Sequence, residues 1–151
     1  AVIYRARNQP GDIEKGLDCL KEAEALVDEH GSNKNRANIH EEYGRLLAAQ
    51  GDHRRAIAAY QTALTHQGEP ARKTKLHLAL AAAHQGVGDR DKAAWHLGQA
   101  SLALKDIAPA EGDKDLAELY SDLGLFYREF GDAEQANVYL ARSVELYRKL
   151  Q

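Results

Sequence analysis

Apolar residues recur along this chain at steps of three and four residues, in stretches that are separated by glycine. The stripe before Gly51 consists of Ile39, Tyr43, Leu46 and Leu47, and the stripe after it of Ala56, Ile57, Tyr60, Ala63 and Leu64. Such spacing is typical of helices with one apolar face. It predicts helices near residues 12–30, 34–50, 52–67, 70–87, 89–105, 113–130 and 132–150, and a short helix near 1–9.

The dipeptide Gly-Asp marks the turns between these stretches. It begins at residues 11, 51, 88 and 131, so that it recurs at intervals of 40, 37 and 43 residues. Glycine can adopt the left-handed conformation that ends one helix, and the aspartate can cap the start of the next one. A turn at nearly constant period with helix on both sides predicts a stacked array of antiparallel helical hairpins.

Small residues repeat at spacings of 12 and 7 within this pattern. The three sets are Gly44, Ala56 and Ala63; Ala81, Ala93 and Ala100; and Gly124, Ala136 and Ser143. Helices whose axes approach closely need small side chains at the point of contact. We therefore expect the two helices of each hairpin to pack tightly at these positions.

These residues resemble the tetratricopeptide repeat family. Tyr120, Leu123-Gly124 and Tyr127 match its first-helix pattern, and Ala56, Tyr60 and Ala63 match its second. The resemblance implies an all-α fold, a right-handed superhelical solenoid of about four antiparallel helix hairpins. One domain would then span 1–151, with repeats near 1–30, 34–67, 70–105 and 113–150. The intervals exceed the 34 residues that are usual for the family. In this respect the chain is similar to the longer-repeat subclass of the family.

The ends of the chain leave two alternatives open. The first repeat keeps only residues 1–8 of its first helix, and the last helix has no polar cap, so Val144, Tyr147 and Leu150 have a face to bury. Solenoids normally need capping repeats. We expect either that the chain is a segment of a longer protein, or that its last helix pairs with a second copy in a homodimer.

Composition and charge exclude several classes of partner. The formal net charge is −3 and no Lys/Arg run is longer than two, whereas nucleic-acid binders carry a concentrated basic face. The longest apolar run, near residues 78–83, is far shorter than the roughly 18–20 residues that span a bilayer. A single cysteine, Cys19, permits no internal disulfide and fits a reducing compartment. We expect a cytoplasmic protein that binds neither nucleic acid nor membrane.

Catalytic and metal-binding patterns are not found in the sequence. His77 and His84 are seven residues apart and take the place of packing aromatics, while Glu41 and Glu42 point in directions about 100° apart on a helix. Gly86-Val87-Gly88 separates two helices and does not follow a strand, as a dinucleotide-binding loop would. We therefore expect no enzyme activity, no cofactor and no metal.

The predicted function depends on the concave surface that the first helix of each repeat would line. Its candidate partner-binding residues are Asn38, Glu41, Glu42, Arg45, Lys75, Leu78, Ala82, Gln85, Glu118, Ser121, Asp122, Leu125 and Arg128. Leu78, Ala79 and Ala82 would form an apolar floor, and the separated cations would meet the charges of a peptide. The alternative for this surface is a solvated face with incidental charges.

Residues outside this groove supply further candidate contacts. Trp95 and Val138 are expected on the convex side, and Tyr147 and Leu150 at the uncapped end; exposed apolar patches often mark contacts. The leading hypothesis is a protein–protein interaction module that binds a peptide or helix of a partner protein. The alternative is a ligand-sensing or self-associating regulatory segment of a larger signalling or transcription protein.

Overall fold

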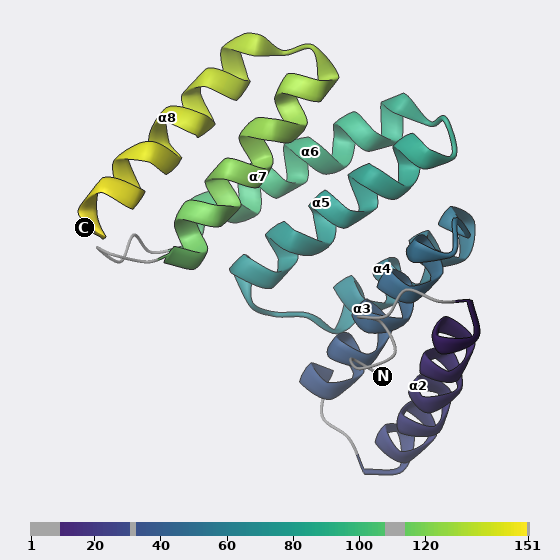
Figure 1. Cartoon of the computed structure of the whole chain (residues 1–151). Coiled ribbons are helices and arrows are strands. Elements are labelled where there is room, and N and C mark those ends of the chain that lie inside the picture. Colours follow the sequence, from purple (N-terminus) through teal and green to yellow (C-terminus); the bar gives the residue numbers. More distant parts are fainter. Residues whose placement is uncertain (1–9, 31–32, 108–113, 151) are drawn as a thin grey trace. The chain divides into compact units, whose positions relative to one another are not determined.

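The computed structural model describes residues 10–30, 33–107 and 114–150, and within these ranges every regular element is a helix (Figure 1). The helices are α2 (Pro10–His30), α3 (Asn33–Ala49), α4 (His53–His66), α5 (Pro70–Gly86), α6 (Arg90–Lys105), α7 (Lys114–Phe130) and α8 (Ala133–Lys149). None of these described helices has the length and apolar character needed to cross a membrane. The all-α fold class predicted from the sequence is therefore confirmed.

The observed helix bounds lie within two residues of the predicted ones, but the first turn differs. The chain is helical from Pro10 onward, so Gly11 and Asp12 lie inside α2 and do not form a left-handed turn before it. Proline is favoured at the first position of a helix because its fixed φ suits the helix and its missing N–H is not needed there. The helix predicted near 1–9 lies outside the described residues.

The other three Gly-Asp turns share one set of interactions. Gly51, Gly88 and Gly131 have φ angles of 83°, 81° and 89°, in the region that side chains other than glycine avoid. In each turn the aspartate N–H donates to the carbonyl five residues earlier, at 2.9 Å. The Asp52 and Asp132 carboxylates then accept from the N–H three residues later, at 3.2 and 3.1 Å. The local sequence thus ends one helix and begins the next within a few residues.

The small residues identified in the sequence are all buried between paired helices. Each of the nine members of the three sets is buried, seven of them with 0–3 % exposure. Large side chains lie against the glycines, since a methyl group added to Gly44 would meet the Tyr60 ring at 2.7 Å, and one added to Gly124 would meet Leu140 Cγ at 2.7 Å. Ser143 also donates to the carbonyl of Ala117 at 2.9 Å. Close helix contact is therefore built into each hairpin.

The chain forms two compact units. The first contains α2, α3, α4 and residues 82–90, and the second contains residues 69–81 with α6, α7 and α8. In the first unit α3 packs against α2 and α4. In the second, α7 and α8 are antiparallel neighbours (Figure 1), and Leu78, Leu97, Leu104, Leu119 and Leu123 belong to one buried cluster.

The close contact at Gly124 predicts opposite outcomes for two glycine substitutions. Gly124→Ala should lower the free energy of unfolding, because overpacking costs about 1–3 kcal/mol and exceeds the gain in helix propensity of roughly 1 kcal/mol. Gly98→Ala in α6 is the matched control, because no atom lies within 4 Å of the added methyl group. It should raise the free energy of unfolding. Urea denaturation of both variants measures the difference, and an equal gain in both would disprove the close contact.

Candidate functional site

The predicted groove residues of α3 form a cluster of charges. Arg45 donates to Glu41 at 2.7 Å and to Glu42 at 3.0 Å. These spacings of four and three residues place all three side chains on one side of the helix. Glu41 is buried, whereas Glu42 and Asn38 are half-buried. The guanidinium group is shared between two carboxylates, so Arg45 is not a free cation for a ligand.

A buried tyrosine lies beside the α3 cluster. Burial raises the pKa of Tyr60 to about 12, and Glu41 and Glu42 add to the rise while Arg45 opposes it. Tyr60 also packs on Gly44, one residue before Arg45. Tyr60 thus takes part in the packing of the α3–α4 hairpin and also interacts electrostatically with the charge cluster.

A second group of charges lies on α5 and α7 in the second unit. Burial, followed by the nearby Glu118 carboxylate, raises the pKa of Asp122, while Lys75 lowers it. Glu118 also lies 4.0 Å from Lys114, in an exposed pair. Leu125 follows on the same side of α7 and is 38 % exposed. We call Glu118, Asp122 and Leu125 the α7 row; it combines two carboxylates with one apolar side chain.

Leu78 was predicted as the apolar floor of the groove, and its burial contradicts that position. It is 6 % exposed and belongs to the buried cluster with Leu97 and Leu119. Thr74, Leu76, His77, Leu80 and Ala81 are also buried. A helix that buries residues around most of its circumference cannot be assigned one solvent face from the sequence pattern.

The remaining groove candidates stay accessible. Ala82, Gln85, Lys75 and Arg128 are exposed, and Ser121 is half-buried. Ala82 and Gln85 belong to the first unit, while Lys75, Ser121 and Arg128 belong to the second.

The predicted packed histidines include an unexpected pair. His77 Nδ1 and His96 Nδ1 lie 3.0 Å apart, so one ring nitrogen donates and the other accepts. The Trp95 ring meets His96 edge-on with a centroid distance of 4.8 Å. His77, His84 and His96 are all buried. Among the described residues no group of three His, Cys, Asp or Glu side chains could hold a metal ion.

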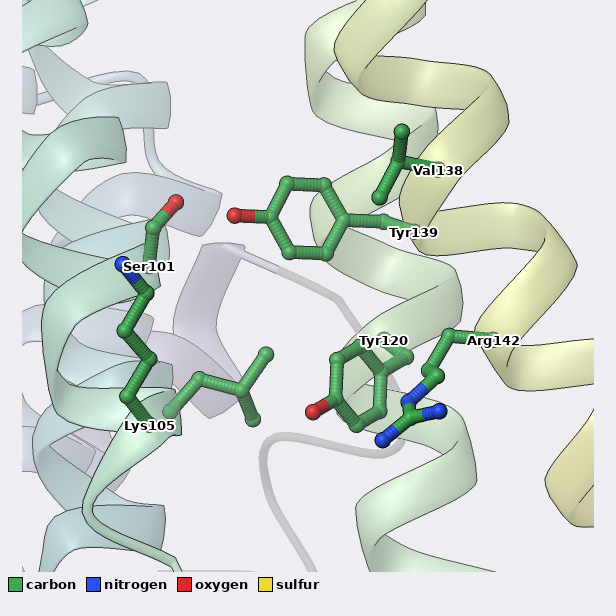
Figure 2. Close-up of a pocket in the computed structure, with 7 residues that line it drawn as sticks. Ser101, Lys105, Tyr120, Val138, Tyr139 and Arg142 are labelled. Atoms are coloured by element: carbon green, nitrogen blue, oxygen red, sulfur yellow. The ribbon is translucent and has the colours of Figure 1, made fainter.

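A pocket of about 240 Å³ that the sequence analysis missed opens between α6, α7 and α8 (Figure 2). Ser101, Leu104 and Lys105 line it from α6. Tyr120 contributes from α7, and Val138, Tyr139 and Arg142 from α8. Figure 2 shows the Tyr139 hydroxyl pointing across the pocket toward Ser101. Three helices build this pocket, so no single helical stripe could have indicated it.

A hollow also lies at the equivalent place of the α3–α4 hairpin. The positions of Tyr120, Val138 and Tyr139 correspond, 80 residues earlier, to His40, Ala58 and Ala59 in the α3–α4 hairpin. Those residues line a hollow of about 330 Å³ together with Tyr43, Arg55 and Thr62. Because the residue types at the equivalent positions differ, the sequence alone did not indicate either hollow.

The predicted contacts outside the groove are accessible. Trp95 and Val138 are 58 % and 59 % exposed, and Tyr147 and Leu150 are 38 % and 40 % exposed. Val138 borders the α6–α7–α8 pocket, whereas Tyr147 and Leu150 lie at the end of α8. These residues provide apolar surface at two separate places.

The histidine pair predicts a loss of stability in mild acid. Burial and then the nearby Lys73 lower the pKa of His77 from 6.5, so the unfolded chain binds a proton more readily than the folded one. The free energy of unfolding should therefore fall as the pH drops below 6.5. His77→Gln should reduce this slope in urea denaturation measured at several pH values. An unchanged slope, with both proteins folded at pH 8, would contradict the assignment.

Comparisons with known proteins do not add a function to this geometry. No model of a known protein family matches the chain, and no curated protein is significantly similar to it. The resemblance to the tetratricopeptide repeat therefore remains a prediction from the residues of this chain. The candidate sites for a function of this chain are the two charge clusters, the pocket and the exposed apolar residues.

Proposed function

We propose that this chain is a protein–protein interaction module of the tetratricopeptide type, a solenoid of helix hairpins that binds a peptide or helix of a partner protein. The observation that supports the proposal most directly is the α7 row. Partner recognition needs accessible side chains of mixed chemistry on a rigid element, and the α7 row provides carboxylates and an apolar side chain on one well-packed helix.

The charges favour a partner segment that carries Lys or Arg. On α7 the Glu118 carboxylate lies close enough to Asp122 to raise its pKa, and the exposed Lys114–Glu118 pair at 4.0 Å offsets the charge of Glu118 only weakly. Burial, and after it the neighbouring Glu118 carboxylate, raises the pKa of Asp122, so that its charged form is disfavoured. A cation from the partner would offset the repulsion between the two carboxylates, and complementary charge of this kind also speeds association.

The apolar part of the partner would meet Leu125. This side chain lies one helical turn from Asp122 and is 38 % exposed. A segment with a cationic and an apolar side chain at similar spacing would therefore satisfy both features of α7. Helix-in-groove and extended-peptide binding both use such anchors.

Reversing the charges of the α7 row should strongly reduce partner capture. The Glu118→Lys and Asp122→Lys double variant would repel a cationic segment, and we expect the amount of partner captured from a lysate of the source cells to fall by about tenfold. Mass spectrometry of captured proteins, compared with the unaltered chain, measures this loss.

The matched control changes two carboxylates at the same spacing on α2. Asp18 and Glu22 are both exposed and, like Glu118 and Asp122, four residues apart. The Asp18→Lys and Glu22→Lys variant has the same net charge and should retain the partner. Equal loss in both variants would show that net charge alone causes the effect and would contradict a site on α7.

Self-association is a second candidate function, favoured by the exposed face of α8. Val144, Tyr147 and Leu150 correspond, 43 residues earlier, to Ser101, Leu104 and Ile107. In the second unit, α7 covers that earlier face: Leu104 is 2 % exposed and Ser101 lies 3.1 Å from the Tyr127 hydroxyl. The α8 residues at the same positions are 38–49 % exposed. A helix of a second copy could cover them as α7 covers α6.

Sedimentation equilibrium tests this second function. The unaltered chain should self-associate, and Val144→Lys with Tyr147→Lys should raise the dissociation constant by at least about tenfold, because two apolar contacts are replaced by charges. Leu102→Lys is the control, since Leu102 is 55 % exposed elsewhere on α6. A monomeric unaltered chain, or equal weakening by the control, would exclude self-association through α8.

A further inference from the structure

The α6–α7–α8 pocket lies on a different face of α7 from the α7 row. With about 100° per residue, Glu118, Asp122 and Leu125 are turned roughly 140° to 160° away from Tyr120, which lines the pocket. Among the described residues that line the pocket, the two charged ones, Lys105 and Arg142, are both cations. The chemistry of the pocket is therefore opposite in sign to that of the α7 row.

Aromatic rings form a rigid wall of this pocket. Tyr139 stacks on Tyr127 with a centroid distance of 5.5 Å and an interplanar angle of 6°, and on Tyr120 at 6.1 Å and 27°. Leu104 adds a buried apolar side chain, and Val138 lies at the rim. Stacked rings of this kind hold one another in place, so an apolar ligand would find a preformed surface.

The two cations flank the pocket from different helices. Figure 2 shows Lys105 running along α6 with its ammonium group beside Ser101, and the Arg142 guanidinium group beside Tyr120 on the other side. Arg142 is 3.4 Å from Glu145, and both side chains are more than half exposed, so that pair contributes little. Lys105 forms no ion pair with any residue that the structure describes. Both cationic side chains are thus available to bind an anion in the pocket.

In the described α5–α6 hairpin, other residues stand at the equivalent places. His77, Trp95 and His96 stand where Tyr120, Val138 and Tyr139 stand in the last hairpin, and their rings contact one another. The position of Arg142 corresponds to Thr62 and Gln99. The two cations with the stacked Tyr120 and Tyr139 rings are therefore not repeated at the equivalent places of the α5–α6 hairpin, and the α3–α4 hollow has a single Tyr and a single Arg among its described lining residues.

From these observations we infer that the pocket binds a small organic acid, as an anion with an aromatic or branched aliphatic body. Lys105 and Arg142 hold the anionic group, because a guanidinium fork matches the two oxygens of a carboxylate. The body lies against the tyrosine rings and Leu104. The volume of about 240 Å³ is below the range of roughly 300–1,000 Å³ typical of ligand pockets, so the ligand is fragment-sized. This site is independent of partner binding by the α7 row.

Three related probes test the inference on the unaltered chain. They are 3-phenylpropionate, the neutral 3-phenylpropan-1-ol and the cationic 3-phenylpropylamine, each titrated into protein labelled with ¹⁵N. The acid should bind most tightly and shift the amides of Lys105, Tyr120 and Tyr139, whereas the amine should bind most weakly. An acid that binds no better than the alcohol, or that shifts amides only elsewhere, would overturn the inference.

Matched variants separate the two cations from net charge. Lys105→Gln with Arg142→Gln should weaken binding of the acid by about tenfold, since each exposed ion pair contributes up to about 1 kcal/mol, while binding of the alcohol stays the same. Arg148→Gln with Lys149→Gln removes the same charge from the end of α8 and should leave both affinities unchanged. Equal effects of the two double variants would refute the assignment of Lys105 and Arg142.

The anion could come from a free acid or from adjacent side chains of a protein, and one further titration distinguishes them. The peptide acetyl-Gly-Phe-Glu-Gly-amide presents a ring and a carboxylate with no free terminus. Tighter binding than 3-phenylpropionate, lost in the Lys105 and Arg142 variant, would assign the pocket to a protein segment. Weaker binding would assign it to a free small acid, and failure of both probes to bind would reject the pocket as an anion site.

Discussion

The close approach of paired helices at small residues is the constraint on which the rest of this structure depends. Gly44 accepts the ring of Tyr60, and Gly124 accepts Leu140, at distances that leave no room for a methyl group. Gly51 and Gly131 turn the chain in the left-handed region just after these contacts. Because the turn and the helix contact are both fixed, the rotation of each helix about its own axis is defined in the α3–α4 and α7–α8 hairpins. That rotation decides which side chains remain on the surface.

The surface left by this packing carries chemistry that differs from face to face. On α7, the helix buries Leu119 and Leu123, presents Glu118 and Asp122 on one exposed side, and lines a pocket with Tyr120 on another. A single rigid helix therefore supports an acidic row and a cationic pocket without either disturbing the other. This separation is the physical basis for proposing two independent binding functions, one for a partner segment and one for a small organic acid.

Much of the fold follows from local sequence, because its determinants are local. Helix bounds could be read from the Gly-Asp turns and the apolar spacing, since the turn hydrogen bonds join residues at most five apart. The left-handed turn predicted at Gly11 is wrong, because Pro10 already begins α2 before it. The site was harder to predict: Leu78 is buried by neighbours on several sides, and Arg45 is held by Glu41 and Glu42. The pocket needs three helices, and a pattern along one helix does not contain that information.

The central claim is that α7 presents a recognition surface for a cationic, apolar segment, and one titration tests it most directly. An amphipathic peptide of Lys and Leu, and its twin with Glu in place of every Lys, would be added to ¹⁵N-labelled protein. If α7 is the recognition surface, the Lys peptide shifts the amides around Glu118, Asp122 and Leu125, and the Glu peptide leaves them unchanged. Equal shifts with both peptides, or shifts confined to other helices, would contradict it.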